Sequence, residues 1–121
     1  MNDTLWLVLF LFTKHFIVDF PLQKPYQWMN KGTYLHPGGI LHAGLHGLAT
    51  MLAFAWYAPM ACVYLGFIDA FIHYHIDWAK MNINQRMGWG ANTHEEFWWL
   101  LGLDQFLHAL TYVLLIALVT Q

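Results

Sequence analysis

Four long apolar segments constrain this chain more than any other feature of its sequence. They cover residues 5–20, 40–58, 60–79 and 97–119, and each approaches the roughly 20 residues that a helix needs to cross a bilayer. Pro59 separates the second segment from the third, because proline lacks an N–H group and disfavours helical geometry in the residue before it. We therefore expect four membrane-spanning helices, with a tight turn between the middle two.

The low charge of the chain favours the same interpretation. Only 10% of the residues are charged and 59% are hydrophobic, whereas soluble domains typically carry about 25% charged residues. The Lys and Arg residues lie at or beyond the end of the first segment, or between the third and the fourth. By the positive-inside rule, these connections are cytoplasmic and both termini face outward. The sequence predicts one all-α integral membrane domain over residues 1–121, with a soluble helical bundle as the alternative.

The cysteine count and the net charge exclude other classes of protein. The single cysteine, Cys62, excludes a disulfide framework and a cysteine-rich zinc ribbon. A formal net charge of -2 argues against a nucleic-acid binder. Gly44, Gly47 and Gly66 suit close packing of helices, either within one chain or in a homo-oligomer.

Histidine and aspartate recur with a spacing of four residues, once in each apolar segment. The pairs are His15 and Asp19, His42 and His46, His73 and Asp77, and Asp104 and His108. Residues i and i+4 share one helix face, and ionisable groups inside a membrane are costly unless they face inward and find partners. The pattern predicts a metal site built from all eight residues in the cytoplasmic half of the bundle. The alternative is a lock of His–Asp hydrogen bonds.

The same pairs indicate an internal repeat of two helices. His15 precedes His73 by 58 residues, and His42 precedes Asp104 by 62. In an up-and-down bundle, such copies are parallel and related by an axis along the membrane normal. The predicted fold is therefore a four-helix bundle with a two-helix pseudo-repeat. Its ligand set suits two adjacent divalent ions, with zinc as the first choice and manganese or iron as alternatives.

Three further polar residues lie near these pairs, and the sequence leaves two roles open for Asp69 and for Lys80. Asp69 lies one turn before His73, where it is either a relay to the site or an ordinary buried hydrogen-bonding group. Lys80 either extends to the membrane interface or holds a substrate phosphate or carboxylate. His75 lies about 200° around the helix from His73, so we expect it to face elsewhere.

Four short runs resemble a known family of small four-span membrane proteins of bacteria and phages, which is classed as a domain of unknown function. The runs are HFIVDFPLQ (15–23), LHAGLH (41–46), HYHIDWAK (73–80) and DQFLH (104–108). The pattern is more distantly similar to inner-membrane metal-dependent hydrolases. The resemblance implies a multi-pass protein of the bacterial inner membrane with periplasmic termini, and metal binding by the eight residues named above.

The leading hypothesis is a membrane-embedded metal-dependent hydrolase that acts from the cytoplasmic side. Two ions would activate a bridging water and polarise a phosphoryl or acyl oxygen. Asp77 or Asp104 would act as general base. Membrane lipid or a lipid-linked phosphate is the expected substrate class. The alternatives are a metal or proton pathway without catalysis, and a di-iron redox enzyme.

Overall fold

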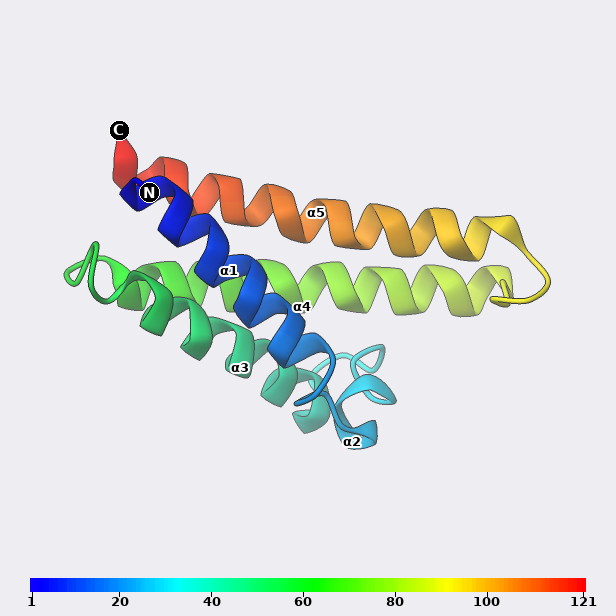
Figure 1. The fold of residues 1–121 in the computed structure, drawn as a ribbon. Helices are drawn as coiled ribbons and strands as arrows, with labels where there is room; N and C mark the ends of the chain where they lie inside the picture. The colour runs from blue at the N-terminus through cyan, green and yellow to red at the C-terminus, as the bar shows by residue number, and fades with distance from the viewer.

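The computed structural model describes residues 1–121 and is all-helical, as predicted. The helices are α1 (Asp3–Asp19), α2 (Pro25–Trp28), α3 (Pro37–Phe54), α4 (Cys62–Met87) and α5 (Glu95–Thr120). α1 and α4 each pack against both α3 and α5, so the four long helices enclose a common interior. Both termini lie at the same end of the molecule as the α3–α4 turn, and the α4–α5 loop lies at the opposite end (Figure 1).

Local sequence signals explain most of the helix ends. The Asn2 side chain caps α1 by accepting a hydrogen bond from the Leu5 amide. The predicted turn at Pro59 is confirmed, since α3 ends at Phe54 and α4 begins at Cys62. α4 continues beyond the predicted apolar segment until Gly88, whose φ of 68° is left-handed and suits glycine.

The prediction of four membrane-spanning helices is wrong. α5 is the one helix that is long and apolar enough to cross a membrane, judged by length and composition. α1 has only 17 residues, and α4 includes Asp69, Asp77, Lys80 and Arg86 along its length. The prediction accepted the polar and charged residues as inward-facing groups of a membrane bundle, but α1 is too short and the polar residues of α4 make it too little apolar for a span.

The enclosed interior has an apolar half and a polar half. The apolar half lies at the end that holds the termini, where Leu7, Leu11, Phe54 and Leu115 are fully buried. The polar half lies further along the same helices. Its buried groups, two of which come from the α1–α3 connection, are Lys14, Gln27, Lys31, His42, His46, Thr50, Asp69, His73, Asp77, Asp104, His108 and Thr111. Burial of so many polar side chains requires partners for each of them, and these partners define the candidate site.

α3 and α4 cross closely at two glycines, Gly47 and Gly66. A Cβ atom added to Gly47 would lie 2.7 Å from the carbonyl oxygen of Gly66 and 2.9 Å from Cβ of Ala70. A Cβ atom on Gly66 would likewise lie 2.7 Å from the carbonyl oxygen of Gly47. Backbone atoms cannot move aside as a flexible side chain can, so this crossing sets how deeply α3 and α4 bury their polar residues.

We expect Gly47→Ala to lower the free energy of unfolding by about 1–3 kcal/mol, because the added methyl group forces α3 away from α4. The matched control is Gly44→Ala on the same helix, where a Cβ would meet nothing within 4 Å. That variant should gain up to about 1 kcal/mol from the higher helix propensity of alanine. Denaturant unfolding followed by circular dichroism measures both. Equal stabilities of the two variants would contradict the close crossing.

Candidate metal centre

The polar half brings potential metal ligands from all four long helices to one place. Two groups have ligand atoms that lie within 4.8 Å of one another. The first group is Asp19, His42, His46 and His73, and the second is His73, Asp77 and His108. The groups share His73, so they form one continuous cluster. Together they contain every predicted ligand except His15 and Asp104.

Two carboxylates of the cluster, those of Asp19 and Asp77, share His42 as a close neighbour. Oδ1 of Asp19 lies 2.7 Å from Nε2 of His46 and 3.1 Å from Nε2 of His42. Oδ2 of Asp77 lies 3.3 Å from Nε2 of His42 and 3.1 Å from Nε2 of His73. The other oxygen of Asp77 lies 3.3 Å from Nε2 of His108. His42 thus stands between the two carboxylates.

Gln27 fixes which nitrogen of His42 faces the carboxylates. The Gln27 side-chain NH2 group donates to the carbonyl of Leu22 at 3.3 Å, so its Oε1 is left to accept from Nδ1 of His42 at 3.1 Å. A neutral His42 that donates through Nδ1 has a lone pair on Nε2. That lone pair points at two carboxylates and at Nε2 of His73, 3.3 Å away. Only a proton or a cation between these atoms relieves their repulsion, which is the arrangement of a metal site.

The environment prepares part of the cluster for a metal ion. Hydrogen bonds to carboxylates outweigh burial and raise the pKa of His42, and that of His108 to about 9, so an ion must displace a proton from these two rings. Burial lowers the pKa of His46 to about 3, so this imidazole is neutral at physiological pH. Burial alone would raise the pKa of Asp19, but hydrogen bonds from His15, from His46 and, when its Nε2 is protonated, from His42 outweigh it and hold that pKa well below its ordinary value. A neutral imidazole beside an ionised carboxylate is the ligand form for divalent ions.

A buried network of Lys14, Asp69 and Thr50 lies between the cluster and the apolar half. Nζ of Lys14 lies 2.6 Å from Oδ2 of Asp69, which also accepts from the Thr50 hydroxyl at 2.5 Å. Lys14 also lies 3.1 Å from Nδ1 of His46. A charged Lys14 donates to this nitrogen and leaves the ring proton on Nε2, directed at Asp19. His46 therefore fits metal ligation less well than His42. Asp69 serves this buried ion pair.

The structure does not bring His15 and Asp104 into either group. Nδ1 of His15 accepts from the Tyr112 hydroxyl at 2.6 Å, and Nε2 of His15 lies 2.9 Å from Oε1 of Gln105 and 3.1 Å from Asp19. Gln105 in turn donates to Oδ2 of Asp104 at 2.9 Å. Oδ1 of Asp104 is buried without a hydrogen-bond partner, 3.4 Å from Nε2 of His108. These two residues flank the cluster, His15 in contact with Asp19 and Asp104 beside His108.

Sequence reasoning missed Gln27 and Lys31, which reach the site from the α1–α3 connection. Gln27 is the buried residue of the short helix α2, which begins at Pro25. Nζ of Lys31 lies 3.4 Å from Oδ2 of Asp77 and 3.0 Å from Oε1 of Gln23. No periodic spacing marks either residue, because a connection follows neither helical nor strand periodicity. His75 faces away from the cluster, as expected, and contacts Tyr34.

Gln27→Leu should weaken binding of a divalent ion by about 10- to 100-fold, as is typical when the group that orients a metal-binding histidine is lost. The change removes the acceptor for Nδ1 of His42 without altering any ligand atom. Gln85→Leu is the matched control, because Gln85 is exposed on α4. Competition with a chromophoric chelator measures both affinities. Wild-type affinity in Gln27→Leu would show that His42 is not oriented by this contact.

Comparison with known proteins identifies the family but no activity. The chain matches, over residues 7–121, the family described as "Protein of unknown function (DUF3307)". The matched range includes the whole cluster. No curated protein and no solved structure matches the chain. The expected likeness to inner-membrane hydrolases therefore stays a prediction, whereas the resemblance to a family of unknown function is confirmed. The chain belongs to the DUF3307 family.

Proposed function

We propose that this protein is a divalent-metal-dependent hydrolase that acts on a lipid or phosphoester substrate. The observation that carries the proposal is the position of His42, whose Nε2 faces Asp19, Asp77 and His73 at once. When bound there, a divalent ion would polarise the scissile group and lower the pKa of a water molecule. Zinc suits this set of imidazole nitrogens and carboxylate oxygens best, and manganese or iron are alternatives.

The charge of the site supports one resident ion and an anionic substrate. Three of the four aspartates in or beside the cluster pair with a lysine, namely Asp69 with Lys14, Asp77 with Lys31 and Asp104 with Lys80. Asp19 has no lysine within ion-pair distance and faces histidines only. One divalent ion compensates this carboxylate and leaves a single positive charge for a hydroxide or an anionic substrate. A second ion would leave a large buried positive charge unless an anion such as a phosphate came with it.

The number of imidazoles supports the same conclusion. His73 is common to both groups, and a neutral imidazole nitrogen has a single lone pair that binds one ion. Two resident ions would have to compete for it. We therefore propose that the second ion of the predicted pair binds together with substrate.

Asp104 is better placed than Asp77 to act as general base. Both oxygens of Asp77 face histidine nitrogens and serve the cluster itself. Oδ1 of Asp104 is buried but accepts no hydrogen bond, and it lies beside His108 rather than between two rings. An unpartnered carboxylate oxygen next to a metal cluster can accept the proton of an attacking water and return it to the leaving group.

The outer surface supports a membrane lipid as partner. Each of the long helices leaves a large apolar side chain more than half exposed, for example Phe16, Leu52, Phe67 and Trp99. Exposed apolar surface of this extent is typical of proteins that contact a membrane or another protein. We propose that α5 holds the protein at the bacterial inner membrane, so that lipids reach the cluster from the side.

A metal or proton pathway is less well supported. A pathway needs polar groups on both sides of the cluster, and the Lys14–Asp69–Thr50 network extends the polar region toward the termini. Beyond this network, fully buried Leu7 and Phe54 close the interior. The polar region is therefore closed on that side, as suits an active site.

We expect Asp104→Asn to keep bound metal and to lose turnover by about 10²- to 10⁴-fold, because an amide cannot accept the proton. The matched control is Asp3→Asn at the exposed start of α1, and His42→Ala should lose the metal itself. Hydrolysis of bis(p-nitrophenyl) phosphate and of a phospholipid panel, together with metal analysis of each variant, measures these effects. Full turnover in Asp104→Asn would remove Asp104 as the base. Absence of hydrolysis by metal-replete wild type on every substrate would contradict the proposed function.

A further inference from the structure

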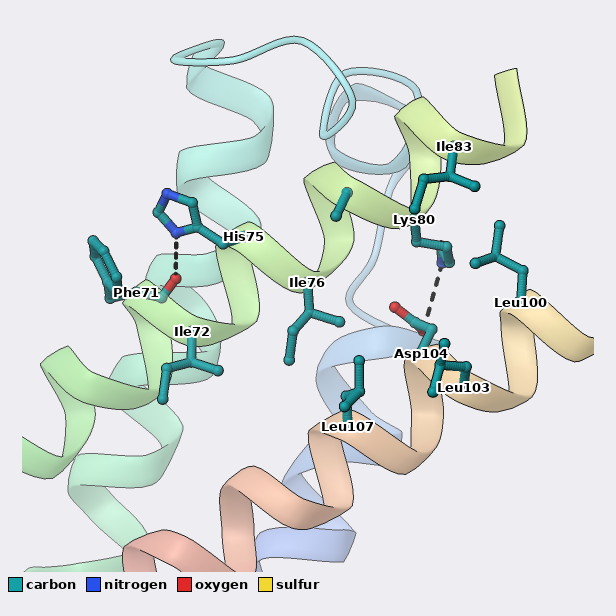
Figure 2. A pocket seen from close by; sticks show the side chains of 11 residues that line it. Phe71, Ile72, His75, Ile76, Lys80, Ile83, Leu100, Leu103, Asp104 and Leu107 are labelled. Carbon is teal, nitrogen blue, oxygen red and sulfur yellow. Dashed lines mark hydrogen bonds and ion pairs between the residues drawn. The ribbon is translucent and has the colours of Figure 1, made fainter. Parts of the chain in front are cut away.

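An apolar groove runs between α4 and α5, next to the candidate metal centre. Its volume is about 380 Å³, within the range of small-molecule sites. Isoleucines of α4 and leucines of α5 form its walls (Figure 2). The groove follows α5, the helix that is apolar enough to cross a membrane, and exposed Phe71 and Leu103 continue it onto the apolar exterior.

The groove has two charged residues in its wall, Lys80 and Asp104. Nζ of Lys80 lies 3.6 Å from Oδ2 of Asp104 (Figure 2), whereas the corresponding distance from Lys14 to Asp69 is 2.6 Å. The Lys80 side chain is 18% exposed and that of Asp104 is 2% exposed. A molecule in the groove therefore meets the cation before it meets the carboxylate. A loosely paired, accessible ammonium in an apolar wall suits a phosphate.

Two side-chain contacts connect the groove wall to the metal cluster. Asp104 lies 3.4 Å from Nε2 of His108, and His108 lies 3.3 Å from Oδ1 of Asp77. An anion held at Lys80 thus lies beside the proposed base and near the cluster.

A second cavity of about 350 Å³ adjoins the groove at Lys80. It shares Lys80 and Leu100 with the groove and includes Trp28 and Asn84 in its wall. Oδ1 of Asn84 is buried and accepts no hydrogen bond. This oxygen can accept a hydrogen bond from a hydroxyl or amine of a polar head group. Lys80 therefore lies where the groove meets a second, largely apolar cavity that holds one unused polar acceptor.

We propose that the α4–α5 groove binds the hydrocarbon chain of a lipid phosphate whose phosphate group lies at Lys80 and whose head group extends toward Asn84. The proposal rests on the proposed function and assigns its substrate class, a lipid phosphoester in place of a soluble one. Hydrocarbon is the occupant that fits, because the walls are apolar and continue along α5. The sign of the accessible charge selects an anionic lipid over a cationic one.

Binding of dodecyl phosphate to the metal-loaded protein, followed by native mass spectrometry in non-ionic detergent, tests the groove. Leu103→Trp fills it and should weaken binding by about ten-fold or more, since much of the chain's apolar contact is lost. Leu110→Trp is the matched control. It lies two turns along the same face of α5, is similarly exposed and is absent from the groove wall. Equal binding by the two variants would overturn the proposal.

The phosphate position is tested separately at Lys80. Lys80→Met should weaken dodecyl phosphate by about ten-fold, the size of a charge-assisted hydrogen bond, and leave binding of dodecanol unchanged. Lys80→Arg should retain binding, and Lys24→Met is the exposed control. Tighter binding of dodecyltrimethylammonium than of dodecyl phosphate, or inorganic phosphate binding as tightly as dodecyl phosphate, would overturn the proposal.

Activity on a small ester separates this proposal from the proposed function. If Leu103→Trp keeps its metal, hydrolyses bis(p-nitrophenyl) phosphate and binds dodecyl phosphate as wild type does, the groove proposal fails and the hydrolase stands. If metal-loaded protein hydrolyses nothing but its binding of dodecyl phosphate depends on Leu103 and Lys80, the groove stands and the reaction fails.

Discussion

The fold depends on neutralising the aspartates that α1, α4 and α5 bury in one interior. An ionised carboxylate without a partner in such surroundings costs several kcal/mol, so the helices can pack only where each aspartate meets a counter-group. Lysines supply it for Asp69, Asp77 and Asp104. Asp19 meets only imidazoles, and these neutralise it fully when a proton or a metal ion joins them. The requirement for a cation therefore arises from the packing itself.

The apolar half of the interior stabilises the fold, and the polar half holds the candidate metal site. Toward the termini, leucines, Phe54 and Ile116 form an apolar core, and the Gly47–Gly66 crossing holds α3 close to α4 next to it. Packing in this apolar half sets the directions in which the four long helices continue into the polar half. The positions of His42, His73 and Asp77 follow from these directions, so the polar half is positioned by contacts in which it takes no part.

Helical periodicity explains which parts of the site were predictable. His42 and His46, or His73 and Asp77, share a face whatever the details of packing, so their convergence could be expected from spacing alone. Gln27 and Lys31 enter from a connection whose path depends on the short helix α2, and no spacing rule applies there. The spacing also suggested equivalent roles for His15 and His73. The structure places His73 at the centre and His15 at the edge, because Tyr112 and Gln105 occupy the ring nitrogens of His15. The four-span prediction failed for a related reason: the polar residues that build the site also make α3 and α4 less apolar than a membrane span, and α1 is too short.

X-ray absorption spectroscopy of the purified protein, at the edge of whichever divalent metal it retains, tests the central claim most directly. The account predicts imidazole nitrogen and carboxylate oxygen ligands at about 2.0–2.2 Å. It also predicts that His42→Ala and Asp19→Asn each abolish this signal, while Gln85→Leu leaves it unchanged. A protein that retains no divalent metal after purification and loading, or a spectrum that is the same in all three variants, would contradict the account.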